Sequence, residues 1–408
     1  MRIAIVHDYL PGYAGSERCL EQIIKLYPSA DLFALVDFIP DAERGFLLHK
    51  PVTTSFLQKI PFIERIFRKL LPLMPLAIEQ FDLSAYDLIL SSSHAVAKGV
   101  IVGPDQVHLS YVYSPMRYAW DLQHQYLRES RLERGPLSWV ARAMLHRLRV
   151  WDCRTSNGVD QFVAISQFIA RRIHKVYRRQ AQVIYPPVDI ERFTVHRAKE
   201  DYYLTASRLV PYKHTELIVR AFNALPERHL IVIGDGPELT RLRQIAKSNV
   251  QFLGYQPFET LRHHMQRARA FVFAAEEDFG IVTVEAQACG TPVIAYGKGG
   301  ATETVVPGVT GVFFDEQTDA SLLLALKEFE ARERDFDPDV IRSNATRFGM
   351  ARFADEFRAA VERAIRSSCG SHDWPDGHWS IPVENVRGEF QAVDLCGVED
   401  EPQNSKWR

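Results

Sequence analysis

The chain has 408 residues, enough for two domains with separate hydrophobic cores, and its 46% hydrophobic and 25% charged residues are ordinary for a globular protein. A net charge of −2, without a dense basic stripe, argues against nucleic acid as a partner. No apolar run approaches the roughly 18 residues of a membrane span, the N-terminus enters a strand directly, and five scattered cysteines form no CxxC pair. We therefore expect a cytoplasmic protein without a signal peptide, a disulfide framework or a zinc site.

The first half of the chain predicts a parallel α/β domain, because short apolar strands alternate with loops and helices. Strands are expected over residues 2–7, 31–36, 88–91, 108–113 and 161–165. In the loop after the first strand, Gly12 and Gly15 allow the backbone to approach a ligand closely. Their spacing is not GxGxxG, which counts against a dinucleotide-binding oxidoreductase.

Charge is distributed unevenly between the two halves. Residues 1–190 carry 23 Lys and Arg against 18 Asp and Glu, a net charge of +5, and the remainder carries 26 against 33, a net charge of −7. Two basic amphipathic helices are predicted, over 63–71 and 139–151. Each helix either lies on an anionic membrane surface or packs on its own domain, and the uneven charge itself is compatible with chance.

Polar side chains gather near strand ends in this half. Tyr113, Arg117 and Asp121 belong to a segment with more large polar-tipped residues than a buried strand needs. His94 and His108 also fall near strand ends, where each has either a structural role or a ligand contact. We take Tyr113, Arg117, Asp121 and His94 as acceptor-side candidates.

A change of domain is predicted after the fifth strand. Ser166 has the position of a helix N-cap, with the helix running from Gln167 onward. The pair Pro186-Pro187 then forms a rigid connector. We place the N-terminal domain over residues 1–187.

The second domain, over residues 188–346, repeats strand and helix cleanly, which predicts a parallel, doubly wound sheet. Its strands are expected over residues 203–206, 230–234, 250–253, 270–275, 293–296 and 311–314. Arg208 and Lys213 flank a turn after the first of these strands. Because ligands of open α/β sheets bind at the carboxyl ends of the strands, this pair supplies two cations for a diphosphate.

The segment 270–303 organises the second domain. A buried strand leads into a loop with Glu277, a helix starts near Ile281, and a second strand follows Gly290. The backbone amides of Gly280 and Ile281 at the helix start suit a phosphate, since helix N-termini carry unpaired N–H groups and a positive partial charge. Glu285 has the chemistry to accept hydrogen bonds from ribose hydroxyls.

These residues resemble a known family. The pattern Glu277-x7-Glu285, with Phe279-Gly280 inside it and Ala288-x-Gly290-Thr291-Pro292-Val293 after it, is similar to the signature of retaining glycosyltransferases of family 4, which have the GT-B fold. Thr283 departs from the proline that many members carry there. The resemblance covers residues 1 to about 366 and implies two facing Rossmann-like domains with a deep cleft between them.

The resemblance also implies roles for single residues. Glu277 would lie beside the donor sugar, Glu285 would hold the ribose, and Arg208 and Lys213 would stabilise the departing diphosphate without a metal. Gly15 would belong to a loop that closes over the donor, and Gly234 and Gly254 would lie near the nucleobase. Segment 111–121 is similar to the acceptor side of bacterial enzymes that build surface polysaccharides, with Tyr113 where many relatives have histidine.

We therefore predict a retaining, metal-independent glycosyltransferase that uses a nucleoside-diphosphate sugar. The resemblance favours GDP-mannose, with glucose, galactose and rhamnose donors still open. The acceptor would be a saccharide or a lipid-linked saccharide at the inner face of the plasma membrane. The alternatives are a nucleotide-sugar epimerase of the same fold and a non-catalytic sugar-nucleotide-binding subunit.

Two features near the end of the chain complete the prediction. Asp335-Phe336-Asp337 spells the DxD motif of a different glycosyltransferase fold, but its place in an acidic linker indicates a surface segment and helix cap, so no metal is expected. A terminal amphipathic helix is expected over 347–366, crossing back onto the N-terminal domain as in GT-B proteins. Residues 367–408, rich in Gly, Pro, Ser and acidic residues, are expected to be largely disordered.

Overall fold

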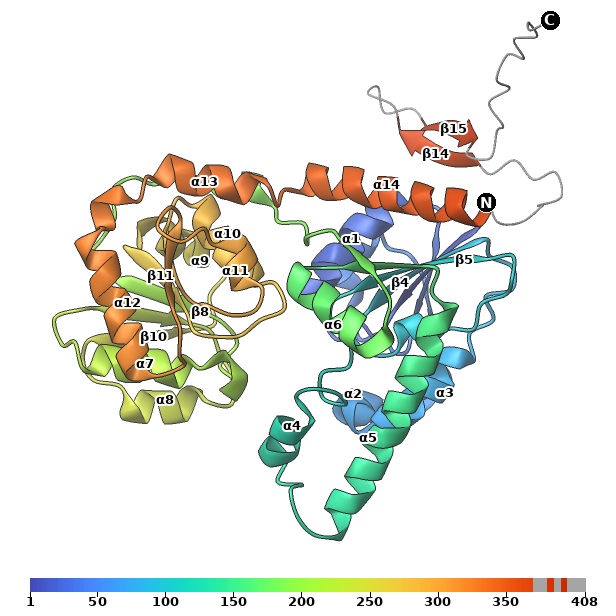
Figure 1. Ribbon diagram of the computed structural model, residues 1–408, viewed down its shortest axis with the longest axis horizontal. Helices are drawn as coiled ribbons and strands as arrows, with labels where there is room; N and C mark the ends of the chain where they lie inside the picture. Colours follow the sequence, from blue (N-terminus) through green and yellow to red (C-terminus); the bar gives the residue numbers. More distant parts are fainter. Residues whose placement is uncertain (370–379, 385–389, 395–408) are drawn as a thin grey trace, which may run out of the picture. The chain divides into compact units, whose positions relative to one another are not determined.

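A computed structural model describes residues 1–369, 380–384 and 390–394 of the chain (Figure 1). The protein forms two compact units, of which the first comprises residues 1–163 with 355 onward, and the second residues 164–354. Each unit is described by itself below.

The first unit is built on a sheet with the strand order β3-β2-β1-β4-β5-β6-β7. The pairs β1 with β2, β1 with β4, β2 with β3 and β4 with β5 are all parallel. The strands are β1 (Ile3–His7), β2 (Asp31–Ala34), β3 (Val52–Thr54), β4 (Leu88–Ser93), β5 (Val107–Val112), β6 (Gln161–Ala164) and β7 (Ala181–Val183). The order reverses between β1 and β4, and such a switch point is where open α/β sheets bind ligands.

Helices pack around this sheet and bury its apolar side chains. They are α1 (Gly15–Leu26), α2 (Ile63–Ile66), α3 (Met74–Glu79), α4 (Gln123–Glu129) and α5 (Pro136–Thr155), with 3-10 turns η1 (Asp41–Leu47), η2 (Phe56–Lys59), η3 (Phe67–Leu73), η4 (Ala97–Gly99) and η5 (Ser156–Gly158). The last long helix, α14 (Met350–Cys369), belongs to this unit from Asp355. Its Phe357 ring lies 6.5 Å from that of Tyr27 and 5.9 Å from that of Tyr111.

The helix predicted over 63–71 is broken into α2 and η3. Pro72 lies inside η3 and Pro75 follows in the first turn of α3, and proline cannot donate the hydrogen bonds that a continuous α-helix needs. Ile63 and Phe67 are buried, and Leu70 packs against the same core. The apolar face of this segment therefore packs on its own unit, as the second of the two alternatives predicts.

Strand β3 was not predicted from the sequence. It has three residues at the edge of the sheet, and none of them is fully buried. An edge strand of this length produces no apolar run, so periodicity gives no signal for it.

The second unit contains a six-stranded sheet in the order β10-β9-β8-β11-β12-β13, and its neighbouring strands pair in parallel (Figure 1). The strands are β8 (Tyr203–Ala206), β9 (Leu230–Ile233), β10 (Val250–Gly254), β11 (Ala270–Phe273), β12 (Val293–Tyr296) and β13 (Gly311–Phe314). All six lie where the sequence predicts them. The strand order reverses between β8 and β11, which sets the switch point of this sheet.

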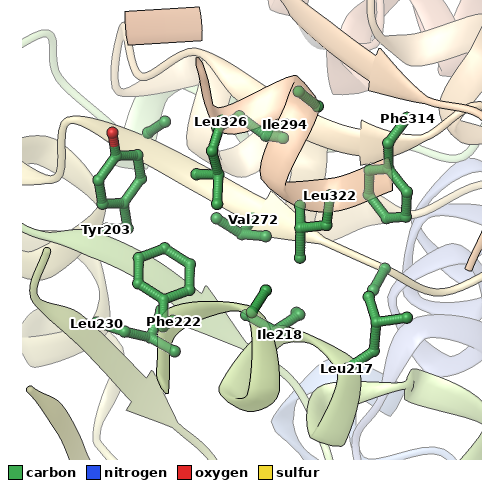
Figure 2. Close-up of a cluster of buried hydrophobic side chains, with 14 of the residues drawn as sticks. Tyr203, Leu217, Ile218, Phe222, Leu230, Val272, Ile294, Phe314, Leu322 and Leu326 are labelled. Carbon is green, nitrogen blue, oxygen red and sulfur yellow. The ribbon is translucent and has the colours of Figure 1, made fainter. Parts of the chain in front are cut away.

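Helices connect these strands and cover the sheet. They are α6 (Gln167–Tyr177), α7 (Thr215–Asn223), α8 (Leu239–Ile245), α9 (Phe258–Arg267), α10 (Ile281–Ala288), α11 (Ala301–Thr304), α12 (Asp319–Ala331) and α13 (Pro338–Thr346), with 3-10 turns η6 (Ile190–Arg192), η7 (Pro211–Lys213) and η8 (Glu333–Asp335). Figure 2 shows the core where Ile218 and Phe222 of α7 and Leu322 of α12 meet Val272 of β11. Apolar side chains at helical spacing thus hold both helices on the sheet.

Two observations concern the region of the predicted connector at Pro186-Pro187. Packing assigns Ala164 onward to the second unit, whereas sheet order continues the first sheet to β7, so the boundary near Pro187 stays a prediction. The predicted cap is confirmed, because Ser166 Oγ accepts a hydrogen bond from Ile169 N at 3.1 Å. Asp337 likewise caps α13 by accepting from Asp339 N at 2.8 Å.

The tail differs from the expected disorder at two places. The structure forms an antiparallel pair of strands, β14 (Ser380–Glu384) and β15 (Phe390–Asp394). The other residues of the predicted tail beyond Cys369 lie outside the described part of the chain.

Candidate functional site

The loops at the carboxyl end of the second sheet are tied to one another by backbone hydrogen bonds. Leu209 N donates to Asp235 O at 2.9 Å, joining the loops after β8 and β9. Gly234 N donates to Gly254 O at 2.8 Å, joining those after β9 and β10. The predicted donor-binding residues on these three loops therefore share one edge of the sheet.

Lys213 and Glu277 meet across the switch point. Lys213 ends η7 after β8, Glu277 follows β11, and the Lys213 ammonium forms an ion pair with the Glu277 carboxylate. Their side chains are 15% and 21% exposed, so both charged groups remain within reach of a ligand. Arg208, on the same loop as Lys213, is exposed.

The start of α10 supplies the predicted helix terminus. Gly280 has φ +85°, a left-handed conformation that favours glycine, and precedes Ile281 at the first helical position. Thr283 Oγ1 donates to Gly280 O at 2.7 Å and lies 3.0 Å from Thr304 Oγ1. Threonine therefore fixes this turn through hydrogen bonds at the position where the resembling family often has proline.

Glu285 lies on α10 and is 6% exposed. A carboxylate this deeply buried requires hydrogen-bonding partners, because its desolvation is otherwise costly. Glu285 is not without a partner. The helix thus holds this carboxylate in place eight residues after Glu277.

Two glycines allow a third loop to approach Glu277. A Cβ on Gly299 would lie 2.5 Å from Glu277 O, and one on Gly300 would lie 2.3 Å from Phe279 Cα. Gly300 N donates to Glu277 O at 2.7 Å. Side chains at these positions would displace the backbone that carries Glu277.

Gly234 and Gly254 are required for different reasons. A Cβ on Gly234, with φ +138°, would lie 1.8 Å from Ser207 O, next to Arg208. Gly254 has open space around it but a φ of +70°. Close approach explains the first glycine, and backbone conformation explains the second.

Sequence reasoning missed the contacts by which the start of α6 binds Glu303 and Asp278, the residue next to Glu277. Glu303 accepts hydrogen bonds from Gln167 N at 2.7 Å and Phe168 N at 2.8 Å. Asp278 accepts at its carbonyl from Ser166 Oγ at 2.6 Å and at its carboxylate from Arg172 Nη1 at 3.1 Å. The cap signal at Ser166 was visible in the sequence, but partners more than 100 residues away were not.

In the first unit, Asp8 organises the switch point between β1 and β4. Its carboxylate is buried and accepts hydrogen bonds from four consecutive backbone amides, at distances of 2.5, 2.9, 2.6 and 2.6 Å for His94, Ala95, Val96 and Ala97. Four amide donors satisfy most of the accepting capacity of a carboxylate. Asp8 therefore fixes the loop that carries His94.

A second buried chain of hydrogen bonds involves Tyr113. Its hydroxyl lies 2.8 Å from Ser92 Oγ and donates to Ser16 O at 2.9 Å, and Ser92 Oγ lies 2.9 Å from His7 Nδ1. Burial raises the pKa of Tyr113 well above its usual value, so the phenol stays neutral. The partner of the hydroxyl, Ser16 O, lies in the first turn of α1, next to Gly15. The side chain of the other candidate, His94, is 28% exposed.

The remaining acceptor-side candidates differ in exposure. Arg117 is half-buried and Asp121 is exposed, and neither is without a partner. His108 is fully buried, with ring nitrogens 2.8 Å from Ser91 Oγ and 2.9 Å from Gly158 O. Burial lowers the pKa of His108 to about 4, which is consistent with the structural role that was one of its two predicted alternatives.

Neither a membrane span nor a metal cluster occurs in the described residues. No helix there is long and apolar enough to cross a bilayer. No group of three or more His, Cys, Asp or Glu side chains within residues 1–369 and the two strands beyond is placed to hold a metal ion. The DxD motif contributes to a helix cap through Asp337, as described above.

Comparison with known proteins shows which proteins this chain resembles in sequence. Residues 189–347 match the family described as Glycosyl transferases group 1. The chain is 32% identical over 207 residues to a GDP-mannose-dependent alpha-(1-6)-phosphatidylinositol monomannoside mannosyltransferase of Mycolicibacterium smegmatis, covering 43% of this chain and 52% of that protein. It is 28% identical over 267 residues to a D-inositol 3-phosphate glycosyltransferase of Mycobacteroides abscessus, covering 60% and 57%. The chain thus spans about half the length of these curated relatives.

Solved structures extend the likeness to both units. Anabaena HepE in complex with UDP has a TM-score of 0.67 at 20% identity, covering 89% of this chain and 100% of that one. Sucrose-phosphate synthase from Thermosynechococcus elongatus has a TM-score of 0.69 at 18% identity, covering 90% and 100%. The predicted class of two Rossmann-like domains with parallel sheets, the GT-B fold, is therefore confirmed.

Proposed function

We propose that this chain, whose residues 189–347 form a Glycosyl transferases group 1 domain, transfers a sugar from a nucleoside-diphosphate donor to a saccharide acceptor. The observation that carries the proposal is the meeting of Lys213 with Glu277 at the switch point of the second sheet. Arg208 and the amino end of α10 lie on the two loops that bring this pair together. Cations, helix amides and a carboxylate at one sheet edge suit a sugar diphosphate.

The roles follow from the charge that develops as the sugar departs. Arg208 and Lys213 stabilise the leaving diphosphate, and the amides of Gly280 and Ile281 contribute at the helix start. Glu277 lies beside the sugar, and the buried Glu285 holds the ribose. We propose that this set works without a metal and that the transfer retains the anomeric configuration, by the front-face route that the family resemblance implies.

We propose GDP-mannose as the donor. Support comes from GDP-mannose-dependent mannosyltransferases of Mycolicibacterium smegmatis and Corynebacterium glutamicum, which are 32% identical over 207 residues and 33% identical over 180 residues to this chain. The fold neighbour HepE was solved with UDP, which keeps uridine donors as the competing outcome. The nucleobase is the first property to measure.

The acceptor proposed is a lipid-linked saccharide of surface polysaccharide synthesis, met at the inner face of the plasma membrane. Helix α5 of the first unit supports an anionic membrane surface as a partner. Its Leu137 and Trp139 are 69% and 77% exposed, and Arg147 is exposed on the same helix. Sedimentation with phosphatidylglycerol vesicles tests this proposal. The proposal would be contradicted if the protein bound neutral phosphatidylcholine vesicles as strongly as phosphatidylglycerol vesicles, or if it bound neither kind.

The test of the donor site is a thermal-shift panel with GDP, UDP, dTDP, ADP and their sugar conjugates. A ligand that binds only the folded state raises the melting temperature by mass action. We expect a rise with GDP and GDP-mannose that is reduced in Arg208→Ala and Glu285→Ala. No shift with any nucleotide, in a folded sample, would overturn the donor site.

Product analysis separates the proposal from its two alternatives. Incubation with GDP-mannose and methyl α-mannoside should give a disaccharide and GDP. An epimerised nucleotide sugar formed without acceptor would identify an epimerase instead. Donor binding without any turnover would identify a sugar-nucleotide-binding subunit.

A further inference from the structure

A row of hydrogen bonds joins the first turn of α1 to the middle of the first sheet. The Tyr113 hydroxyl lies 2.9 Å from Ser16 O and 2.8 Å from Ser92 Oγ. Ser92 Oγ lies 2.9 Å from His7 Nδ1, and His7 Nε2 lies 3.4 Å from Glu17 Oε1. The side chains of His7 and Glu17 are 0% and 3% exposed, so these groups must satisfy one another.

Each contact in this row determines the donor in the next one. A carbonyl oxygen can only accept, so the single proton of the Tyr113 hydroxyl points to Ser16 O. The Tyr113 oxygen therefore accepts from Ser92, which uses the single proton of the serine hydroxyl. Ser92 Oγ in turn accepts from His7, and the Nδ1 atom of His7 therefore carries a proton.

The contact between His7 and Glu17 then requires a second proton. A neutral imidazole has one N–H group, and here Nδ1 already holds it. His7 Nε2 would then present a bare lone pair to Glu17 Oε1, and two buried acceptors that face each other gain no hydrogen bond to offset their desolvation. A proton between these two atoms turns the contact into a charge-assisted hydrogen bond.

Glu17 is the ionised partner of this pair. Its second carboxylate oxygen, Oε2, accepts a hydrogen bond from Ala14 N at 3.0 Å. Burial by itself raises the pKa of Glu17, but the hydrogen bond and the charge of His7 outweigh burial and hold this pKa below its usual value. The second proton therefore belongs to the ring of His7.

The same groups hold the start of α1 in place. Residues 14–16 are each bound by one neighbouring side chain: the amide of residue 14 donates to Glu17, the carbonyl of residue 15 accepts from Cys19 Sγ at 3.6 Å, and the carbonyl of residue 16 accepts from Tyr113. These three residues end the loop that follows β1, at the switch point of the first sheet. Ligands of open α/β folds bind at this edge.

We infer that His7 is a buried imidazolium, and that His7 and Glu17 are positioning residues that hold the start of α1 and the loop of Gly12 and Gly15 before it. This inference rests on the proposed glycosyl transfer, in which Gly15 is a donor-binding candidate. It adds to that proposal a charged pair beneath the loop, which acts on the ligand through the backbone.

Nitrogen-labelled full-length protein tests the protonation state. Long-range proton–nitrogen correlation spectra show two protonated ring nitrogens for an imidazolium and one for a neutral ring. At pH 7 we expect two for His7 in the native protein. In Glu17→Gln the amide can donate to Nε2, so the ring should become neutral and keep its proton on Nδ1.

Two variants assign the ring. The signals of His7 are those absent from His7→Gln, and, if that variant does not fold, those that change from two protonated nitrogens to one in Glu17→Gln. A bare nitrogen on His7 in the native protein would overturn the inference. So would a Glu17→Gln spectrum in which every histidine ring keeps its native protonation.

Hydrogen exchange measures whether Glu17 holds the start of α1. Glu17→Ala removes the acceptor of Ala14 N, and we expect this amide to exchange about three- to tenfold faster, the effect of one lost hydrogen bond. Glu17→Gln keeps an oxygen acceptor and should retain most of the slow exchange. The matched control is Glu64→Ala, an exposed glutamate on α2. Equal exchange of Ala14 in Glu17→Ala and in native protein would overturn the positioning role.

Kinetics show whether this position matters for the donor. With methyl α-mannoside as acceptor, Glu17→Ala should raise the KM for GDP-mannose about three- to tenfold, and Glu17→Gln should recover most of that loss. Glu64→Ala should leave this KM unchanged. A native KM in Glu17→Ala would show that the loop does not act on the donor.

Stabilisation by GDP separates this inference from the proposed function. If GDP does not raise the melting temperature of the native protein, the donor proposal fails. The ring protonation of His7 and the exchange of the Ala14 amide need no ligand, so they still decide the inference in that case. If GDP does stabilise the native protein and His7 shows a bare nitrogen, the proposed function stands and the inference fails.

Discussion

The two sheets share the strand order 3-2-1-4-5 around their switch points, yet the charged groups at these points differ in how deeply they are buried. In the second unit, Lys213 and Glu277 remain partly exposed at the sheet edge. In the first, Asp8 is buried under four amide donors, and Lys98 and Asp152 form a buried ion pair with 2.7 Å between Nζ and Oδ1. The same topology thus brings charged groups to the switch point of each sheet, and the degree of burial decides whether they remain accessible from solvent or stabilise the loop.

The largest effect is expected from the buried pair of the first unit. Lys98→Met leaves the Asp152 carboxylate buried with Trp120 Nε1 as a donor at 2.7 Å, and breaking a buried pair from one side costs about 3–5 kcal/mol. Urea denaturation followed by tryptophan fluorescence measures the loss. The double variant Lys98→Met/Asp152→Leu should recover much of it, and equal stability of Lys98→Met and native protein would show that this charge is not structural.

The matching change in the second unit should affect activity instead of stability. Lys213→Ala removes a cation from the leaving diphosphate, and we expect kcat to fall about 100- to 1,000-fold with little change in melting temperature. The control is Lys327→Ala, an exposed lysine on α12. Loss of folding in Lys213→Ala would show that the two sheet edges do not differ in the way described.

Acid should destabilise the first unit through His108. Its folded pKa of about 4 lies below the usual 6.5, so the unfolded state binds more protons between these values and stability falls as pH falls through that range. The loss amounts to about 3 kcal/mol at its limit. Denaturation midpoints from pH 7 to pH 4 measure it. His108→Gln should flatten the pH dependence, and an unchanged slope would assign it to other groups.

The smallest effects are expected from removing two helix N-caps of the second unit, and only one of the two caps should also affect GDP binding. Ser166→Ala and Thr318→Ala each remove an N-cap acceptor and should cost about 1 kcal/mol. Ser166 also donates to Asp278 O beside Glu277, whereas Thr318 caps α12. We expect only Ser166→Ala to weaken stabilisation by GDP. Equal weakening in both variants would indicate a general loss of stability.

The sequence predicts the second unit well because its strands are short apolar runs bounded by Gly or Pro, such as Gly234 after β9 and Pro292 before β12. It also places Arg208, Lys213 and Glu277 at one sheet edge, since parallel strands share that edge. The partners of Asp8 and Glu303 escape prediction because they lie 86 to 89 and 135 to 136 residues away. The break after Ile66 was not predicted, because the apolar periodicity of residues 63–71 is that of a continuous helix.

The discontinuity of the first unit has a consequence for synthesis on the ribosome. Its residues 1–163 emerge first, but Phe357, which packs against Tyr27 and Tyr111, emerges only after the whole second unit. At about 5–20 residues per second, the intervening residues 164–354 take roughly 10–40 s to translate. During that interval the nascent first unit presents an uncovered apolar surface where α14 will dock, which makes it a natural client for chaperones that bind close to the exit tunnel.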